Sequence, residues 1–389
     1  MNICIVGAGL NPPFIEAQKK LALELSRQLA RNGHVVHVVT ESSVTSKREK
    51  KVDGIFFHRY QEHMCPPAFA KTIVKLNRYY KFDIIHNQNL TIKKSNLLMS
   101  RPLRKLGVPI LSYFCLEPSL GFGNWVRLVV NDPKDGLMRM LEFNPRSITK
   151  LQLASAGKIV TSSNFLKRRL LETWHDQENV IEVIYPFIDV REFERQKASF
   201  KTMLDVRDTD KLLLFIGTHC IFRGETDFLE ATSIVLRDFP DAKAVLVVPE
   251  PIPERIWSTI SKLGIQKSVK FVRGHIDIAK VMSACDVYVF AGLSSVGGGS
   301  IDPPLTIIES LAAGTPCVAY NTGGIDELPK GRRLIRLVEP SNIRALAESI
   351  TEALTDGTRE EGGETLVGSV FDSEIAAGRF LSIYKKLAG

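Results

Sequence analysis

The sequence predicts an α/β protein with two doubly wound, mostly parallel sheets, one following the other along the chain. Its length of 389 residues suits two or more domains, at roughly 100–200 residues per domain. Short apolar runs rich in β-branched residues alternate with amphipathic helical patterns, as in β-α-β units. The alternation pauses at 186–195 and then starts again. We therefore predict one domain at 1–188, a second at 189–370 and a closing helix at 371–389.

The first half begins with an apolar run at 2–7, which is typical of a buried parallel strand. A helix is expected next, with Leu21, Leu25 and Leu29 on one face and Gly33 as its C-cap. Further strands of this half are predicted at 34–40, 54–60, 83–88, 109–114, 158–163 and 180–185.

The second half repeats the pattern, with a helix near 224–238 and other helices between its strands. In open parallel sheets, ligands bind at the carboxyl ends of the strands. We therefore expect functional residues in the loops after strands, where two facing domains would form a cleft. The strands of this half are predicted at 212–217, 244–250, 268–274, 286–292, 316–321 and 334–339.

The composition excludes several classes of protein. Apolar residues make up 44% and charged residues 24%, which is ordinary for a soluble globular chain. No run approaches the ~20 apolar residues that span a bilayer, and the first residues lack the regions of a secretory signal. The six cysteines stand far apart without a C-x-x-C pair, so neither a zinc site nor a disulfide framework is indicated. We expect a reduced, cytoplasmic location.

The net charge of +8 is unevenly distributed. Residues 1–190 hold 27 Lys and Arg against 16 Asp and Glu, whereas the remaining residues hold 24 against 27. An anionic partner of the first half, such as a membrane surface or a phosphorylated substrate, is one interpretation, and scattered solvated lysines are the other. No aromatic-basic motif accompanies the charge, so no nucleic-acid partner is predicted.

The strongest local pattern lies at 301–329 and follows three consecutive glycines at 297–299. Pro303 and Pro304 suit the start of a helix that contains Glu309. A helix that begins beside a glycine-rich loop offers N–H groups and a positive dipole end to phosphate. Glu309 can accept hydrogen bonds from a ribose diol, although a solvated glutamate on a glycine-flanked helix would produce the same pattern.

This segment resembles the donor-binding region of the family 4 glycosyltransferases, which have the GT-B fold of two Rossmann-like domains. Glu309 matches the second glutamate of that family's signature, 313–316 matches its small-x-Gly-x-Pro run, and 323–327 matches its Gly-Gly-x-x-Glu turn. In this fold the closing helix crosses back onto the N-terminal domain. The resemblance extends over the segments 23–40, 82–89, 213–231 and 371–387.

The resemblance implies transfer of a sugar from a nucleotide-diphosphate sugar, UDP- or GDP-linked, to an acceptor. It also implies retention of anomeric configuration without a metal, and no cofactor other than the nucleotide-sugar co-substrate. The catalytic candidates are Arg223, Asp302, Glu309 and His86. The donor-binding candidates are Gly9, Thr218, His219, Arg223, Gly274, Leu305, Thr306 and Glu309.

The donor side departs from the family pattern at several positions. The first signature glutamate falls on Ile301, and Asp302 stands one position late, where it is a substitute or a helix N-cap. The arginine and lysine that hold the diphosphate in the family fall on Thr218 and Arg223. One cation is therefore lost, and His219, next to Thr218, is a candidate for partial compensation.

The acceptor side departs as well. The early Gly-Gly pair of the family falls on Glu16 and Ala17, and its strand-end histidine falls on Cys115. Glu16, Cys115 and Glu117 are the acceptor-side candidates, with Glu117 as the base if the enzyme inverts. His86 ends a strand, where a structural core histidine is equally common, and a buried Cys115 thiol would be inert.

Two segments of the first half point to the acceptor. Residues 66–81 predict a basic amphipathic helix, which suits an anionic membrane surface or a core-packed position with a solvated basic face. Residues 121–145 carry apolar side chains that suit a lid or a lipid-binding wall. We expect a lipid-linked or polysaccharide acceptor, with peripheral contact at the cytoplasmic face of an anionic membrane.

Three other interpretations stay open. Gly7 and Gly9 after the first strand fit a nicotinamide enzyme in part, but Pro12 replaces the third glycine and Glu41 is late for that fingerprint. A nucleotide-sugar epimerase shares the fold. A non-catalytic GT-B protein, binding a sugar or a partner subunit, would explain the altered signature positions.

Overall fold

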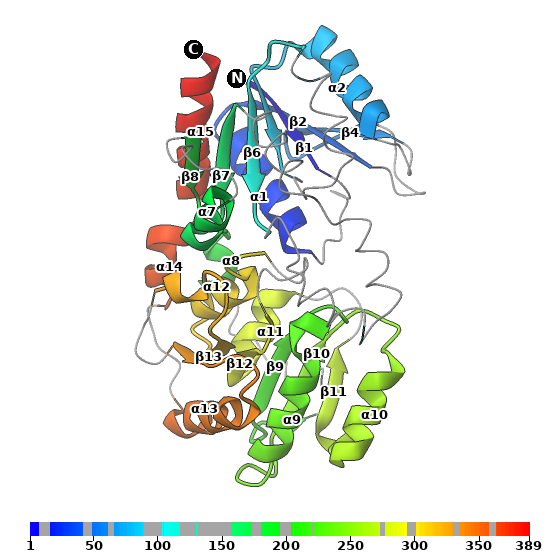
Figure 1. Ribbon diagram of the computed structural model, residues 1–389, viewed down its shortest axis with the longest axis vertical. Coiled ribbons are helices and arrows are strands. Elements are labelled where there is room, and N and C mark those ends of the chain that lie inside the picture. The colour runs from blue at the N-terminus through cyan, green and yellow to red at the C-terminus, as the bar shows by residue number, and fades with distance from the viewer. Residues whose placement is uncertain are drawn as a thin grey trace. The chain divides into compact units, whose positions relative to one another are not determined.

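The structure is a computed structural model that forms two compact units (Figure 1). Unit 1 comprises Met1–Phe187 and Ser373–Gly389, and unit 2 comprises Ile188–Asp372. The residues that the structure describes are 1–7, 16–41, 49–60, 66–88, 103, 105–116, 130, 157–172, 180–194, 204, 206–219, 221–272, 277–293, 301–329, 334–357 and 363–389.

Unit 1 is built on an eight-stranded sheet with the order β3-β4-β2-β1-β5-β6-β7-β8. Every pair in it is parallel except β3 with β4. The central strands are buried on both faces, which explains their continuous apolar sequences. The strands are β1 (Asn2–Val6), β2 (Val35–Glu41), β3 (Glu49–Val52), β4 (Ile55–Tyr60), β5 (Ile84–Asn87), β6 (Ile110–Phe114), β7 (Lys158–Thr161) and β8 (Ile181–Val183).

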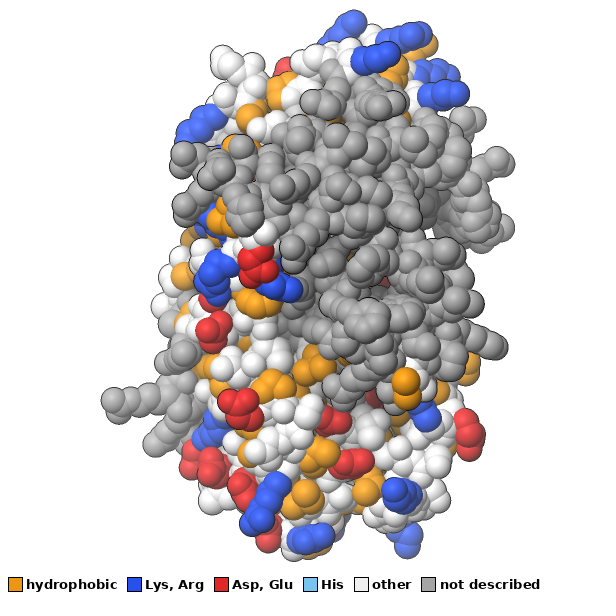
Figure 2. Space-filling view, in the orientation of Figure 1, with side chains coloured by type: hydrophobic (Ala, Val, Ile, Leu, Met, Phe, Trp, Pro, Cys, Tyr) orange, Lys and Arg blue, Asp and Glu red, His pale blue; other side chains and the backbone are white. Residues whose placement is uncertain are grey.

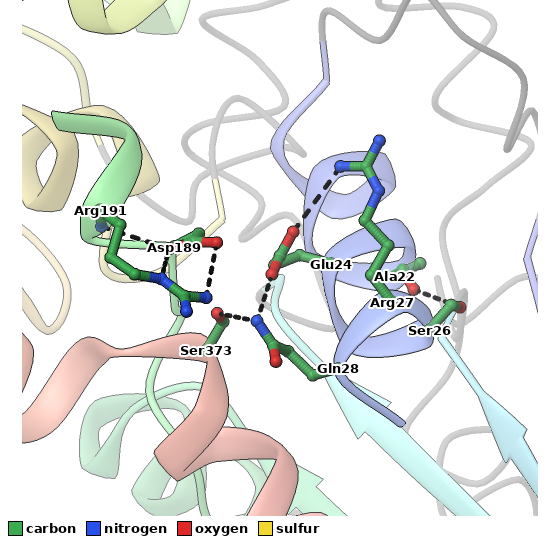
Figure 3. Close-up of polar contacts among 8 residues, drawn as sticks. All are labelled: Ala22, Glu24, Ser26, Arg27, Gln28, Asp189, Arg191 and Ser373. Atoms are coloured by element: carbon green, nitrogen blue, oxygen red, sulfur yellow. Dashed lines mark hydrogen bonds and ion pairs between the residues drawn. The ribbon is translucent and has the colours of Figure 1, made fainter. Parts of the chain in front are cut away.

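The last helix of the chain packs on the first helix of unit 1. Nε2 of Gln28 on α1 donates to Oγ of Ser373 at the start of α15 and to Oε1 of Glu24, each at 2.9 Å (Figure 3). The chain end therefore belongs to the same core as the chain start. The helices of unit 1 are α1 (Ala17–Arg31), α2 (Pro66–Tyr80), α7 (Asn164–Leu171) and α15 (Ser373–Ala388).

Unit 2 has a six-stranded sheet with the order β11-β10-β9-β12-β13-β14, and all of its pairs are parallel. The strands are β9 (Leu212–Ile216), β10 (Lys243–Val247), β11 (Val269–Val272), β12 (Val287–Phe290), β13 (Cys317–Tyr320) and β14 (Ile335–Val338). The helices are α8 (Arg191–Glu194), α9 (Glu225–Val235), α10 (Glu254–Leu263), α11 (Ile278–Ala284), α12 (Leu305–Ala312), α13 (Ile343–Asp356) and α14 (Gly363–Phe371), with 3-10 turns η3 (Ile221–Arg223), η4 (Gln266–Ser268) and η6 (Ile325–Glu327).

Helix ends in unit 2 carry the capping residues that backbone chemistry favours. The side chain of Asp277 accepts from the N–H of Lys280 at the start of α11, and Asn342 accepts from Ala345 at the start of α13. Gly264, in the left-handed region with φ of +69°, ends α10. These local signals define the helices that cover the sheet.

The predicted fold class is confirmed, and every strand expected from the sequence is present. The structure adds β3, which pairs antiparallel with β4 at the edge of the unit 1 sheet. Its sequence, Glu-Lys-Lys-Val, is charged because an edge strand faces water, so no apolar run indicated it.

Candidate functional site

The strand order of unit 2 reverses direction at β9. The next strand in the chain, β10, pairs on one side of it, and β12 pairs on the other. In open parallel sheets such a switch point marks the ligand site, outside the carboxyl ends of the strands. Thr218, His219 and Arg223 all follow β9, so three of the predicted donor-binding residues lie in the segment that the topology selects.

The segment that carries Arg223 lies directly against the end of β12. Gly224 has a φ of +73°, and a Cβ at this position would lie 1.9 Å from the carbonyl oxygen of Ala291. The N–H of Leu293 donates to the carbonyl of Phe222 at 2.8 Å. Only glycine fits at position 224, and this close approach fixes η3, and Arg223 with it, at the switch point.

A buried tyrosine contacts one predicted donor-side residue and is within electrostatic reach of two more. The hydroxyl of Tyr288 on β12 donates to Oγ1 of Thr306 on α12 at 2.6 Å. Burial raises the pKa of Tyr288, and among smaller effects the charge of Arg223 lowers it and that of Glu309 raises it. Both charges are therefore within electrostatic reach of one hydroxyl. Sequence analysis missed Tyr288, whose only signal is a hydroxyl within a buried apolar strand.

The amino-terminal end of α12 faces this group of residues through its own second residue, Thr306. Its N-cap is Pro304, which makes no side-chain hydrogen bond to the helix. The first N–H groups of a helix, here those of Leu305 and Thr306, have no intrahelical partner and attract anions. Glu309 follows within the same helix and is only 3% exposed. Backbone donors, a cation and a buried carboxylate thus come from adjacent elements.

Asp302 is buried and holds a neighbouring loop. Its Oδ1 accepts a hydrogen bond from the backbone N–H of Gly324 at 2.8 Å, and its exposure is 0%. The aspartate therefore connects the segment before α12 to the Gly323–Gly324 turn after β13. This contact gives Asp302 a structural role other than the helix N-cap that the sequence suggested, since the N-cap of α12 is Pro304.

His219 has a protein partner at each ring nitrogen. Its Nδ1 lies 3.0 Å from Oε1 of Glu225, and its Nε2 lies 2.6 Å from the carbonyl oxygen of Pro249. Arg255 on α10 donates to Oε2 of Glu225 at 3.4 Å and to the carbonyl of His219 at 3.0 Å. The ring of His219 is thus engaged within the protein, and Glu225 and Arg255 are two polar residues that sequence analysis did not select.

In unit 1, His86 lies in the core, with an exposure of 0%. Its Nδ1 contacts the hydroxyl of Tyr384 at 2.5 Å, and its Nε2 contacts Oε1 of Gln88 at 2.9 Å. Burial lowers the pKa of His86 to about 4, although the bond to Gln88 acts in the opposite direction. His86 is therefore a neutral core histidine that joins β5 to α15.

Gln88 lies at the switch point of the unit 1 sheet, where β1 and β5 pair. Its backbone N–H donates to the carbonyl of Val6 at 2.9 Å, and its side chain is 1% exposed. Among the described residues its Nε2 has no hydrogen-bond partner. Sequence analysis missed this residue, because nothing in its local sequence indicates that it is buried.

The acceptor-side candidates lie in contrasting environments. Burial raises the pKa of the Cys115 thiol to about 12, so the group stays protonated and unreactive. Glu16 is the N-cap residue of α1, and its exposed carboxylate pairs with Lys19 at 2.9 Å. Gly9, Glu117, Gly274 and nearly all of the segment 121–145 lie outside the described residues.

One face of α2 is basic and exposed. Lys71, Lys75, Arg78 and Tyr79 face solvent, whereas Ile73 is buried in the core of unit 1. Lys and Arg side chains gather over this helix at the upper right of the space-filling view (Figure 2). The helix contains no Asp or Glu, so the charged side chains on its described exposed surface are all positive.

Two features are absent from the described ranges. No helix there is both long enough and apolar enough to cross a bilayer. No group of three or more His, Cys, Asp or Glu side chains there is arranged to hold a metal ion.

Two family models match the chain, one in each half. Residues 18–192 match the model described as glycosyltransferase family 4, and residues 210–356 match that described as glycosyl transferases group 1. An N-acetyl-alpha-D-glucosaminyl L-malate synthase of Bacillus anthracis is 22% identical over 96% of this chain and 94% of its own. An alpha-monoglucosyldiacylglycerol synthase of Streptococcus pneumoniae is 23% identical over 92% of this chain and 78% of its own.

Among solved structures, Anabaena Alr3699/HepE in complex with UDP-glucose has a similar fold. Its TM-score is 0.73, with 15% identity over 100% of both chains. At that identity the likeness bears on the fold alone, and it agrees with two Rossmann-like domains.

Proposed function

Because this chain belongs to the family 4 glycosyltransferases and is an enzyme that transfers sugar from a nucleotide sugar, we propose its substrates and mechanism. The donor is a UDP- or GDP-linked hexose. The acceptor is a lipid or a lipid-linked molecule at an anionic membrane surface. Transfer proceeds with retention of anomeric configuration, and the protein supplies the stabilising charges without a metal.

The packing of η3, which carries Arg223, against the end of β12, together with the hydrogen bond from Tyr288 on β12 to Thr306 on α12, carries the donor-site proposal. A planar guanidinium binds two phosphate oxygens at once, which suits Arg223 for the diphosphate. The first N–H groups of α12 add to this binding. Glu309, buried within the same helix, is suited to accept hydrogen bonds from the ribose hydroxyls.

The proposed reaction exchanges one C–O bond for another. The bond between the anomeric carbon and the diphosphate oxygen breaks, and the acceptor oxygen bonds to that carbon on the same face. The acceptor proton passes to the departing phosphate oxygen, so no side-chain base is required. Negative charge grows on the diphosphate during this step, and fixed donors placed around it stabilise the transition state.

A protein of similar fold and a sequence relative support the choice of substrates. HepE was solved with UDP-glucose, which favours a UDP-linked hexose. The S. pneumoniae relative is a synthase of a glucosylated diacylglycerol, which favours a lipid acceptor. The exposed basic face of α2 supports the same acceptor, because an anionic leaflet attracts such a helix at about 1 kcal/mol per cation.

Calorimetric titration with UDP, GDP and ADP tests the donor site. We expect one of them to bind, Arg223→Gln to weaken binding at least about ten-fold through loss of a charge-assisted bond, and Glu309→Gln to weaken it less. Arg344→Gln, on exposed α13, is the matched control. If none of the three nucleotides binds the wild-type chain, the donor proposal is wrong.

A further inference from the structure

His219 contacts a carboxylate with one ring nitrogen and a backbone carbonyl with the other. A carbonyl oxygen cannot donate, so the Nε2 that lies 2.6 Å from the carbonyl of Pro249 carries a proton. The other nitrogen faces the carboxylate of Glu225 at 3.0 Å. When a proton lies between His219 and Glu225, the pair is either imidazolium with carboxylate or neutral imidazole with carboxylic acid.

Both arrangements give the cluster the same net charge. In the ionised form, His219 and Arg255 contribute two positive charges and Glu225 one negative charge. In the neutral form, only Arg255 is charged. With that proton in place, the cluster of His219, Glu225 and Arg255 carries a single positive charge in either case, and the buried carboxylate does not cancel it.

This charge lies at the switch point of unit 2. The backbone carbonyl of His219, three positions after β9, accepts from Nη2 of Arg255 at 3.0 Å, so the guanidinium lies beside the segment that follows β9. Glu225 begins α9 two positions after Arg223. Thr218, the position at which the resemblance predicts an arginine, adjoins His219. The positive charge lost at 218 is therefore present nearby, supplied by α10.

Arg255 keeps donors for a ligand. A guanidinium has five N–H groups, and within the described ranges Arg255 uses one toward Glu225 and one toward His219. Its side chain is 37% exposed, whereas Glu225 is 2% exposed. The buried carboxylate and the backbone carbonyl each accept one N–H of the guanidinium, and the side chain remains partly exposed to solvent.

We propose that Arg255 is a second phosphate-binding cation of the donor site, held in position by Glu225 and His219. The proposal rests on the proposed function, since its ligand is the diphosphate of the nucleotide sugar. Arg255 binds the ligand directly, whereas Glu225 and His219 are positioning residues. Glu225 fixes the guanidinium, and His219 balances the charge of Glu225 when that carboxylate is ionised.

The test compares nucleoside diphosphates with nucleosides by calorimetry. In Arg255→Gln, we expect affinity for the nucleoside diphosphate that binds the wild type to fall about ten- to hundred-fold. Affinity for the corresponding nucleoside should change less than about two-fold. Arg237→Gln, on the exposed end beyond α9, should leave both affinities unchanged. A merely structural role for Arg255 would weaken nucleoside and nucleoside diphosphate together.

A second variant distinguishes the loss of a phosphate contact from the loss of folded protein. Arg255→Lys keeps the positive charge but loses the planar guanidinium that can bind two oxygens at once. We therefore expect an intermediate affinity for the nucleoside diphosphate and a melting temperature close to wild type. The dependence of affinity on salt should weaken in Arg255→Gln and persist in Arg255→Lys, because one charge contact is lost only in the first.

The results separate this proposal from the one on which it rests. If Arg223→Gln loses diphosphate binding and Arg255→Gln binds as wild type, the donor site stands and the role of Arg255 is refuted. If the wild-type chain binds no nucleoside diphosphate, both proposals are overturned.

Discussion

The hydroxyl oxygen of Tyr384 lies 2.5 Å from Nδ1 of His86, a residue 298 positions earlier in the chain. Both side chains are completely buried. The contact joins α15 to β5, a strand next to the centre of the unit 1 sheet. Because the other ring nitrogen of His86 contacts Gln88, the last helix also sets the orientation of a side chain at the switch point of unit 1.

Tyr384→Phe should therefore destabilise unit 1. The substitution leaves Nδ1 of His86 buried without a partner, which costs about 1–3 kcal/mol. Hydrogen exchange of the β5 amides measures the effect locally, and urea unfolding measures it globally. Tyr79→Phe, at a position 72% exposed, is the control and should change neither. Equal protection of β5 in wild type and Tyr384→Phe would show that the contact contributes nothing.

Acid should destabilise unit 1 through two buried histidines. Burial lowers the pKa of His37 to about 4, with the neighbouring His58 adding to the effect, and burial lowers the pKa of His86 to about 4. Both stay neutral in the folded chain while the unfolded chain takes up protons near pH 6.5. The unfolded state binds more protons between these values, so stability falls as pH falls from about 6.5 to 4.

The loss should reach about 2–3 kcal/mol per histidine at the lower end of that window. Urea unfolding at a series of pH values measures it. His37→Phe keeps an aromatic ring among Phe56, Tyr80 and Phe82 and removes one titrating group, so its pH dependence should be shallower. A wild-type stability that does not change between pH 7 and 5 would contradict this account.

Gly224→Ala should abolish nucleotide binding and destabilise unit 2. The new Cβ would lie 1.9 Å from the carbonyl oxygen of Ala291, so η3 and Arg223 must move. Gly264→Ala is a matched control, since it has a similar φ of +69° but open space around its Cβ. The control should lose only the roughly 1–2 kcal/mol of a left-handed alanine and bind normally. Thermal melting and calorimetry compare the two, and equal losses would refute the steric explanation.

Substitutions of Asp302 separate a structural from a catalytic role. Asn keeps an oxygen that accepts from the N–H of Gly324, whereas Ala leaves that donor buried and unpaired. We expect Asp302→Ala to lose about 1–3 kcal/mol of stability and Asp302→Asn to melt near wild type. Sugar transfer by Asp302→Asn should stay within about ten-fold of wild type, less than the 10²–10⁴ of a lost acid–base group. Inactive but stable Asp302→Asn would assign the carboxylate to the reaction.

The sequence was sufficient to predict the sheets because parallel strands are buried on both faces and appear as apolar runs. The Ile-Ile of β5 and the Leu-Leu-Leu of β9 are examples. The edge strand β3 lacks such a run, because its charged residues face water. The succession of strands and helices along each half of the chain was predicted from their alternating sequence patterns.

The sequence predicted residues of the candidate site only where they lie close together along the chain. Glu309 and the start of α12 belong to one continuous motif. Glu225 and Arg255, by contrast, are thirty positions apart and meet only because β10 and α10 bring them together. A buried glutamate in the first turn of α9 looks like an ordinary helix-start acid until its exposure of 2% is known.

Charge reversal on α2 tests the proposed membrane contact. Lys71 and Lys75 lie on the exposed face of a helix without acidic residues. The variant Lys71→Glu with Lys75→Glu should lose flotation with vesicles that contain an anionic phospholipid, because each removed cation costs about 1 kcal/mol of attraction and each added carboxylate is repelled. Lys262→Glu, exposed on α10 of unit 2, should float as wild type. The wild-type flotation itself should weaken as salt rises, since surface charges are screened. Wild-type chains that stay at the bottom of the gradient at low salt, or a double variant that still floats, would remove α2 from the acceptor side of the proposal.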